Sequence, residues 1–183
     1  DLAAISAPID VLGVNYYTSQ LFRAGQHSSQ PTPHPAAPDA VAVDRPELPR
    51  TDMGWEVTPD AFRELLIGLH RDYTGPAGIP LAITENGAAI DDPDPASGPI
   101  EDRERIDYLH RHLTAVHEAI EAGARVDTYL LWSLIDNFEW AFGYTKRFGV
   151  VAVDDALNRV PKASARWYSE LIRTSTLCLP EQA

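Results

Sequence analysis

One carboxylate stands out because of where the sequence places it. Residues 80–87 (PLAITENG) run from a short apolar segment with a β-branched end to Glu85, and an Asn-Gly pair then turns the chain. This pattern predicts a strand that delivers Glu85 to its tip. A carboxylate in such a place is costly unless it has a partner or a chemical use, because burial disfavours its charge. A capped strand end without chemistry stays open as the alternative from this stretch alone.

A second candidate lies in residues 132–149, which combine two tryptophans, a carboxylate and further aromatic residues. Trp132 ends an apolar segment, and Glu139 and Trp140 follow in the loop. Aromatic faces stack on the apolar ring faces of sugars, and carboxylates accept hydrogen bonds from sugar hydroxyls. The composition is therefore typical of a carbohydrate site, with an aromatic-rich packing loop as the alternative.

The elements that must hold these residues alternate between strand and helix. Three apolar segments predict strands, each followed by an amphipathic helical pattern; they cover residues 11–17, 81–84 and 126–132. The links from strand to helix are long, and those from helix to strand are short. In parallel β-α repeats this asymmetry marks the carboxyl edge of the sheet as the site. Tyr17, Glu85 and Trp132 all stand at that edge.

Capping and stop signals predict the helices. A Thr-Pro pair at residue 58 begins the first helix and a Gly-Pro pair at residue 75 ends it, the second covers residues 102–122, and the third begins near residue 161. The expected buried stripe of the second helix is Ile106, Leu109, Leu113, Val116 and Ile120. Residues 24–50 are expected to form a surface excursion, and residues 174–183 a frayed tail of a single domain, 1–183.

Composition narrows the possible partners. The 183 residues carry a net charge of −12 with a pI near 4.8, which disfavours nucleic acid and anionic membranes as partners. No apolar run approaches the roughly 18 residues of a membrane span. A single cysteine, Cys178, rules out a disulfide framework within the chain. The first six residues lack the pattern of a signal peptide, so a cytoplasmic location is the expectation.

Two other groups of residues could suggest metal binding. His110, His112 and His117 lie on the second helix, but position 121 is Glu and not the second histidine of a zinc motif, so a solvated helix face is expected. Residues 91–94 (DDPD) lack the glycine and terminal glutamate of a calcium loop and are expected to form an ordinary acidic loop. We therefore expect no metal and no cofactor.

The motifs occur in the order seen in a known family. The chain resembles glycoside hydrolase family 1, the retaining β-glucosidases, from residue 11 to about residue 172. Four stretches carry the resemblance: residues 15–17 (NYY), 52–59 (DMGWEVTP), 83–87 (ITENG), and the segment from Trp132 to Trp140 that closes with KRFG at 146–149. The resemblance implies an α/β fold, with this chain as the C-terminal part of a (β/α)8 TIM barrel, about three βα units that would be strands six to eight.

The resemblance also implies roles for individual residues. Glu85 would be the catalytic nucleophile. The implied sugar-binding residues are Asn15 and Tyr17 beside the nucleophile, Trp132 under the sugar, Glu139 and Trp140 at its 4- and 6-hydroxyls, and Phe148 at the border of the pocket. Trp55 would lie nearer the leaving group. Phe142 occupies a position where relatives often carry Glu, which leaves recognition there open. The implied substrate is a β-glucoside or a short cello-oligosaccharide.

One half of the implied active site has no counterpart in the chain. The family's general acid/base belongs to an Asn-Glu-Pro sequence, which does not occur here. The expectation is therefore a barrel whose missing N-terminal half supplies that acid. A split enzyme made of two polypeptides and a non-catalytic sugar-binding half-barrel remain the alternatives. Glu139 and Trp140 favour unphosphorylated sugars, since a carboxylate there would repel phosphate; glucose, galactose and fucose are not distinguished.

Overall fold

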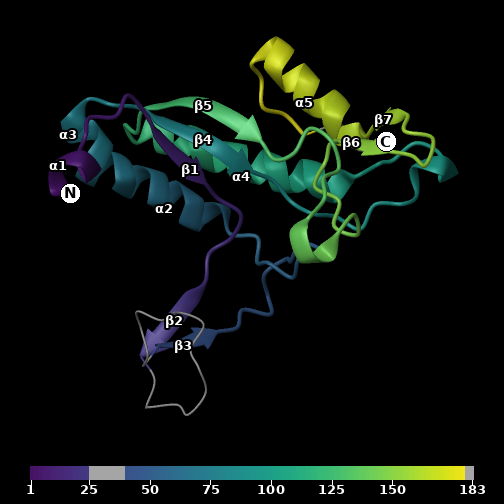
Figure 1. Ribbon diagram of the computed structural model, residues 1–183, viewed down its shortest axis with the longest axis horizontal. Helices are drawn as coiled ribbons and strands as arrows, with labels where there is room; N and C mark the ends of the chain where they lie inside the picture. Colours follow the sequence, from purple (N-terminus) through teal and green to yellow (C-terminus); the bar gives the residue numbers. More distant parts are fainter. Residues whose placement is uncertain (25–39, 180–183) are drawn as a thin grey trace.

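A three-stranded parallel sheet forms the centre of the protein. The computed structural model describes residues 1–24 and 40–179. Its strands are β1 (Leu12–Asn15), β4 (Leu81–Asn86) and β5 (Val126–Leu131), in the order β1-β4-β5 (Figure 1). The three predicted parallel β-α units are thus confirmed, although β1 ends two residues earlier than expected. The β1–β4 pairing contains one register shift and the β4–β5 pairing contains two.

Two helices cover one face of this sheet. The helices α2 (Pro59–Leu69) and α4 (Arg103–Glu121) contribute Phe62, Leu66 and Val116 to a core that also contains Leu81 and Ile83 of β4. Away from these helices, Gly13, Asn15 and Thr84 are exposed, and so is the apolar Leu130 of β5, which is 51% exposed. Because alternate residues of a strand point to opposite faces, this second face is where side chains at the strand ends can meet a ligand.

The first helix extends beyond its predicted end. It continues as a π-helical turn, His70–Thr74, and a short helix α3 (Gly75–Ala77), and it stops at Gly78 with φ +70°. Pro76 is tolerated because it lies in the first turn of α3, where its missing N–H has no obligatory acceptor. Gly75 permits the wide turn, since a Cβ there would lie 2.7 Å from the carbonyl oxygen of His70. The predicted stop at the Gly-Pro pair was wrong.

The helix α4 has the predicted bounds but a different buried face. Gly123 adopts φ +100° just after it, as a stop signal should. Ile120 is 44% exposed and Leu113 is only partly buried, so the predicted stripe was wrong at these two positions. The buried residues are Arg105, Ile106, Tyr108, Leu109, His112, Ala115, Val116 and Ala119. His112 is fully buried, which corrects the expectation of a solvated histidine face.

The acidic loop before α4 also differs from its prediction. Asp92 is buried, and its carboxylate pairs with Arg105 and Lys162. The sequence predicted a solvated loop because the two cations that pair with Asp92 lie 13 and 70 residues further along the chain. The interpretation of residues 91–94 as an ordinary acidic loop was therefore wrong for Asp92.

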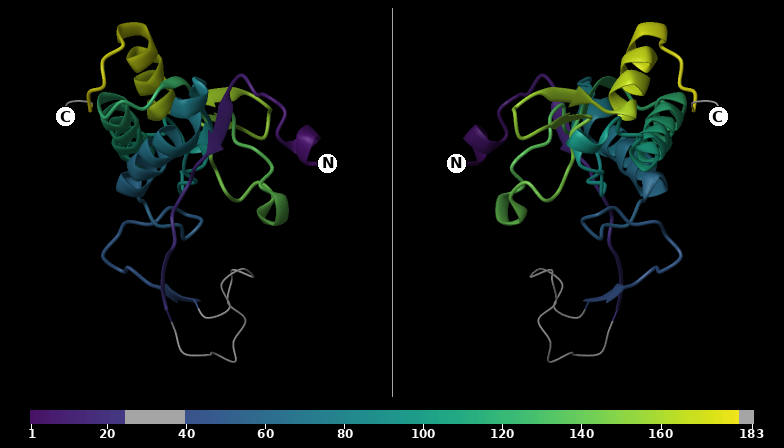
Figure 2. Two further views of the ribbon diagram at one scale, coloured as in Figure 1. Left: turned by 90° about the vertical axis from the view of Figure 1, so that its left-hand side faces the viewer. Right: turned by 90° about the vertical axis from the view of Figure 1, so that its right-hand side faces the viewer.

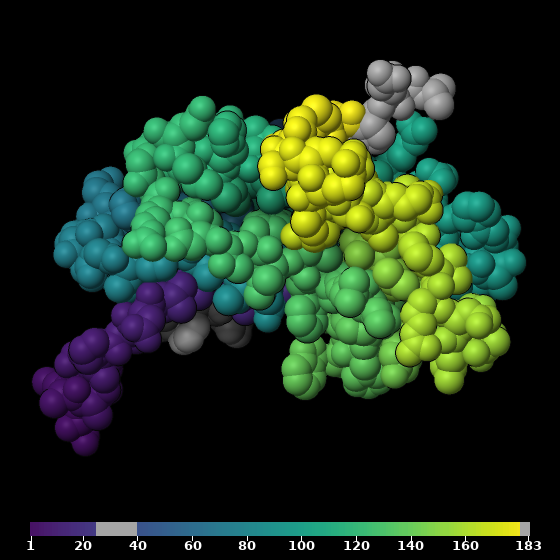
Figure 3. All heavy atoms as spheres, turned by 90° about the horizontal axis from the view of Figure 1, so that it is seen from above, coloured from purple at the N-terminus to yellow at the C-terminus, as the bar shows by residue number. Residues whose placement is uncertain are grey.

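The remaining elements lie outside the central sheet and the two helices that cover it. They are α1 (Leu2–Ile5), the antiparallel hairpin β2 (Leu21–Ala24) and β3 (Ala40–Val43), the 3-10 turns Pro95–Ser97 and Trp140–Phe142, the hairpin β6 (Val151–Val153) and β7 (Arg159–Pro161), and α5 (Ala163–Thr174). Figures 1 and 2 show the β2–β3 hairpin projecting from the sheet, and Figure 3 shows the N-terminal segment extending from the body. Neither hairpin was predicted. Much of the expected excursion, residues 25–39, and the end of the expected tail, 180–183, lie outside the described residues.

After α5 the chain turns back toward that helix. The indole nitrogen of Trp167 donates to the carbonyl oxygen of Cys178 at 2.7 Å, which brings residues after α5 back to that helix. Among the helices in the described ranges, none combines the length and apolar character needed to cross a bilayer.

Candidate active site

A carboxylate and a phenol meet at the carboxyl edge of the sheet. Glu85 is the penultimate residue of β4, and Tyr17 follows β1 by two residues. The register shift after Val14 pairs Asn15 with Glu85 where an unbroken ladder would pair it with Thr84. The Tyr17 hydroxyl donates to Oε2 of Glu85 at 2.5 Å. Such a bond stabilises an ionised carboxylate, because the donor faces the negative charge directly.

The same pair changes the acidity of the phenol. Burial is the largest cause that raises the pKa of Tyr17, and the hydrogen bond to Glu85 and the charges of Glu85 and Glu139 raise it further. The phenol therefore keeps its proton at neutral pH and remains a donor. The contribution of Glu139 shows that both carboxylates act on the same tyrosine.

Asn15 lies next to this pair on the exposed sheet face. Its side-chain oxygen accepts a hydrogen bond from the Thr84 hydroxyl at 2.6 Å, which fixes the direction of the amide. Two strands thus present an amide and a carboxylate side by side, as a site for a polyhydroxylated ligand requires.

A buried network behind Glu85 was not predicted from the sequence. Asn86 accepts from the Tyr129 hydroxyl at 2.6 Å and donates to the carbonyl oxygen of Tyr16 at 2.7 Å, so its side chain joins all three strands. The Tyr108 hydroxyl of α4 donates to the carbonyl oxygen of Tyr17 at 3.0 Å. Burial raises the pKa of Tyr108 and of Tyr129. The signal available in the sequence was an asparagine directly after the candidate carboxylate at the end of an apolar strand.

Aromatic rings form a wall beside the pair. The ring centroids of Tyr17 and Trp55 are 5.5 Å apart, and Phe148 lies 6.0 Å from Tyr17 and 6.2 Å from Trp55. Phe148 is 1% exposed, so it lies behind the other two rings. The structure therefore brings Tyr17, Trp55 and Phe148 together, and Phe148 is the most buried of the three.

The loop after β5 adds a second carboxylate. Its start lies against the turn after β4: Trp132 N–H donates to the carbonyl oxygen of Asn86 at 2.9 Å, and a Cβ on Gly87 would lie 1.7 Å from the Trp132 oxygen. Only glycine fits this close backbone approach. Further along, the Asn137 amide donates to Oε2 of Glu139 at 2.7 Å. Trp132 is partly exposed, whereas Trp140 is 83% exposed at the outer edge of the loop.

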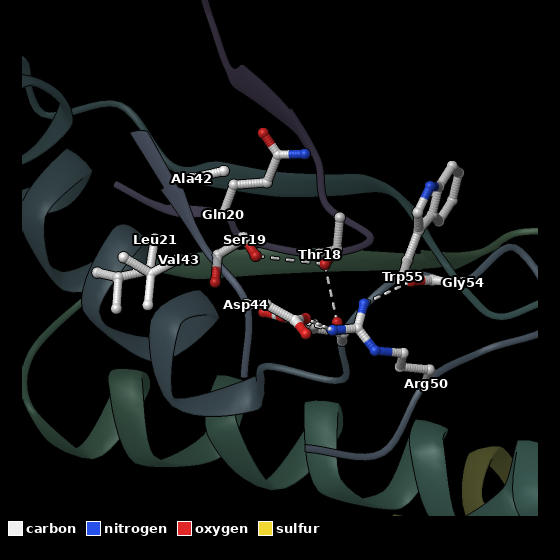
Figure 4. A pocket seen from close by; sticks show the side chains of 11 residues that line it. Thr18, Ser19, Gln20, Leu21, Ala42, Val43, Asp44, Arg50, Gly54 and Trp55 are labelled. Carbon is white, nitrogen blue, oxygen red and sulfur yellow. Dashed lines mark hydrogen bonds and ion pairs between the residues drawn. The ribbon is translucent and has the colours of Figure 1, made fainter. Parts of the chain in front are cut away.

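A separate cavity lies on the other side of Trp55 (Figure 4). Its volume is about 230 Å³, and it opens between the β2–β3 hairpin and residues 50–56. The Thr18 hydroxyl donates to the carbonyl oxygen of Glu56 at 2.8 Å, and Glu56 is paired with Arg45 and Arg50. Trp55 is among the residues that line this cavity, whereas Tyr17, Glu85 and Glu139 are not.

The site's parts define a class of protein: a phenol-bound carboxylate at the carboxyl edge of parallel strands, with an aromatic wall and a second carboxylate. This combination suits enzymes that cleave glycosidic bonds. The Glycosyl hydrolase family 1 model matches residues 1–177. The chain belongs to this family.

Individual relatives agree with the family match. The chain is 46% identical over 181 residues to the bifunctional β-D-glucosidase/β-D-fucosidase of Bifidobacterium breve, covering 94% of this chain and 39% of that protein. It is 43% identical to β-glucosidase A of Acetivibrio thermocellus, covering 96% of this chain and 37% of that protein. The solved family 1 β-glucosidase of Thermotoga maritima superposes with a TM-score of 0.84 at 39% identity, over 97% of this chain and 38% of that one.

The matched regions cover only part of each relative. It spans about two fifths of the length of the curated relatives it matches. Its structural neighbours are TIM barrels, so the three β-α units correspond to a portion of such a barrel.

Proposed function

We propose that this chain is the C-terminal portion, strands six to eight, of a (β/α)8 barrel that hydrolyses β-glucosides with retention of configuration. The observation that carries the proposal is the Tyr17–Glu85 hydrogen bond at the carboxyl edge of the sheet, within a chain of glycosyl hydrolase family 1. β-Glucosides and short cello-oligosaccharides are the proposed substrates, since the relatives bear β-glucosidase names.

In the proposed mechanism Glu85 attacks the anomeric carbon and forms a covalent glycosyl-enzyme. A second carboxylic acid protonates the departing oxygen, and its carboxylate then takes a proton from the water that releases the sugar. In retaining enzymes these two groups lie about 5–5.5 Å apart. The second carboxylate is expected in the N-terminal half of the barrel. The Tyr17 hydroxyl donates to Glu85, and an ionised carboxylate is the form that can attack.

The other residues of the site would hold the sugar. Asn15 would line the pocket beside the nucleophile, Trp132 would stack under the sugar ring, and Glu139 with Trp140 would bind the 4- and 6-hydroxyls. Phe148 supports this pocket from behind. Asn137 supports the assignment for Glu139, because its amide holds one carboxylate oxygen and leaves the other for a ligand.

The test uses the complete enzyme that carries this segment and compares Glu85→Gln with Glu139→Gln. We expect Glu85→Gln to lower kcat on the order of 10³-fold or more with p-nitrophenyl β-D-glucoside, because no nucleophile remains. Glu139→Gln should mainly raise KM. An activated 2-deoxy-2-fluoro-glucoside should leave a covalent sugar on the peptide that contains Glu85.

Three results would speak against the proposal. Activity of Glu85→Gln within tenfold of the wild type would remove the nucleophile assignment, as would a label on another residue. A well-folded complete protein that binds glucose without hydrolysing any β-glucoside would favour the non-catalytic alternative.

A further inference from the structure

A buried ion cluster lies below the loop that carries Glu139. It consists of three carboxylates and two cations: Asp92, Asp102, Asp136, Arg105 and Lys162. Four of these side chains are at most 1% exposed, and Asp136 is 15% exposed. They come from the loop after β4, the start of α4, the loop after β5 and the residue before α5. The cluster therefore joins segments that are far apart in the chain.

Lys162 is the link between the two loops. Its ammonium donates to Oδ2 of Asp92 at 2.7 Å and to Oδ1 of Asp136 at 2.9 Å. Arg105 donates to the same Oδ2 atom of Asp92, also at 2.7 Å, and pairs with Asp102. Without the ammonium, Asp92 and Asp136 would face each other as buried like charges, which is strongly unfavourable.

Asp136 closes the base of the loop after β5. The Oδ1 atom that binds Lys162 also accepts the backbone N–H of Gly149 at 2.8 Å, and Asp136 N–H donates to the Val151 carbonyl oxygen at 3.0 Å. A Cβ on Gly149 would lie 2.2 Å from the Asp136 nitrogen, so the two ends of the loop touch here. The carboxylate of Asp136 therefore fixes where the loop leaves and rejoins the body.

The fixed base leads directly to the sugar-binding carboxylate. Asn137 follows Asp136, and its amide donates to Oε2 of Glu139 at 2.7 Å. The Ser133 hydroxyl donates to the carbonyl oxygen of Ile135 at 2.7 Å, which stiffens the same turn. A continuous path of hydrogen bonds and adjacent residues thus runs from Lys162 to Glu139.

We propose that Lys162 is a positioning residue for Glu139. By holding Glu139 in place, Lys162 sets the preference for sugars that carry the hydroxymethyl group with the 6-hydroxyl. The inference rests on the proposed function, in which Glu139 binds the 4- and 6-hydroxyls. Lys162 touches neither sugar nor nucleophile; it acts by holding Asp136 at the base of the loop. A carboxylate displaced by about 1 Å loses much of its hydrogen bond to a hydroxyl.

The test measures a ratio in the complete enzyme: kcat/KM for p-nitrophenyl β-D-glucoside divided by kcat/KM for the β-D-xyloside, which lacks the hydroxymethyl group. This ratio does not depend on the fraction of folded enzyme. We expect Lys162→Met and Asp136→Asn each to lower it about tenfold, the order of one hydrogen bond to a charged group. Glu139→Gln should lower it similarly, and adding Lys162→Met to that variant should change it little.

Ser164→Ala is the matched control. The Ser164 hydroxyl donates to Oδ2 of Asp102 at 2.5 Å, so the substitution weakens the same cluster without touching Asp136. It should lower thermal stability and leave the ratio unchanged. A merely structural role for Lys162 would give Lys162→Met the same behaviour as this control.

The outcomes separate the two proposals. A wild-type ratio in both Lys162→Met and Asp136→Asn would overturn the positioning role. If Lys162→Met yields no folded protein, the ratio measured for the isosteric Asp136→Asn decides whether the positioning role holds. A wild-type enzyme that hydrolyses neither substrate, or a Glu139→Gln variant with an unchanged ratio, would overturn the proposed function itself.

Discussion

Replacing Tyr17 by phenylalanine tests the central pair of the site. The substitution removes the hydroxyl that donates to Glu85 at 2.5 Å and keeps the ring that packs against Trp55 and Phe148. Hydrogen bonds to charged groups contribute about 1.5–3 kcal/mol. Because Tyr17 and Glu85 are only partly buried, the lower end of this range applies. That amount corresponds to about a tenfold change in a rate or an equilibrium.

The direction of the effect follows from the donor. The Tyr17 hydroxyl stabilises the ionised carboxylate, so its removal favours the protonated form, which cannot attack. The acidic limb of the kcat/KM profile should therefore move toward neutral pH. At neutral pH the loss of activity should be about tenfold, much smaller than for Glu85→Gln.

The assay is the pH dependence of kcat/KM for p-nitrophenyl β-D-glucoside in the complete enzyme. Tyr16→Phe is the matched control, because Tyr16 lies on the opposite sheet face and donates to the Thr58 carbonyl oxygen at 2.7 Å. It should cost about 1 kcal/mol of stability and leave the acidic limb in place. An acidic limb of Tyr17→Phe that coincides with the wild type would refute the role assigned to this phenol.

Two further substitutions probe the surroundings of the site. Burial lowers the pKa of His112 from 6.5 to about 4. Between these pH values the unfolded chain therefore binds a proton that the folded chain does not. The free energy of unfolding should fall by about 3 kcal/mol as the solution is acidified through this range. His112→Gln should remove this part of the decline in thermal midpoint with acid; parallel declines in both proteins would contradict the burial argument. Gly87→Ala should force the backbone of Trp132 away, costing about 3 kcal/mol and most of the activity. Gly68→Ala, where nothing lies within 4 Å of the added Cβ, should retain wild-type activity, and equal behaviour of the two variants would show that the close approach is dispensable.

The sequence determined the strands of the central sheet, the second helix and the candidate carboxylate. The strands at residues 12–15, 81–86 and 126–131 and the second helix were predicted within a few residues, because hydrophobic periodicity and capping signals are local. The position of Glu85 at the tip of β4 followed for the same reason. The helix end after residue 75 was missed because a π-helical turn and a glycine accommodate a proline that normally ends a helix.

Only the tertiary structure decided which polar residues meet. Asp92, His112 and Lys162 look like surface residues in sequence, yet each is buried, since their partners or packing neighbours lie on other segments. The Tyr17–Glu85 bond spans 68 positions and depends on a register shift that no local pattern reports. Burial makes an unpaired charge or amide costly, so the fold brings a partner to each buried polar group. Hydrophobic periodicity shows which residues are apolar, but it carries no information about which distant charge will lie next to a given polar residue.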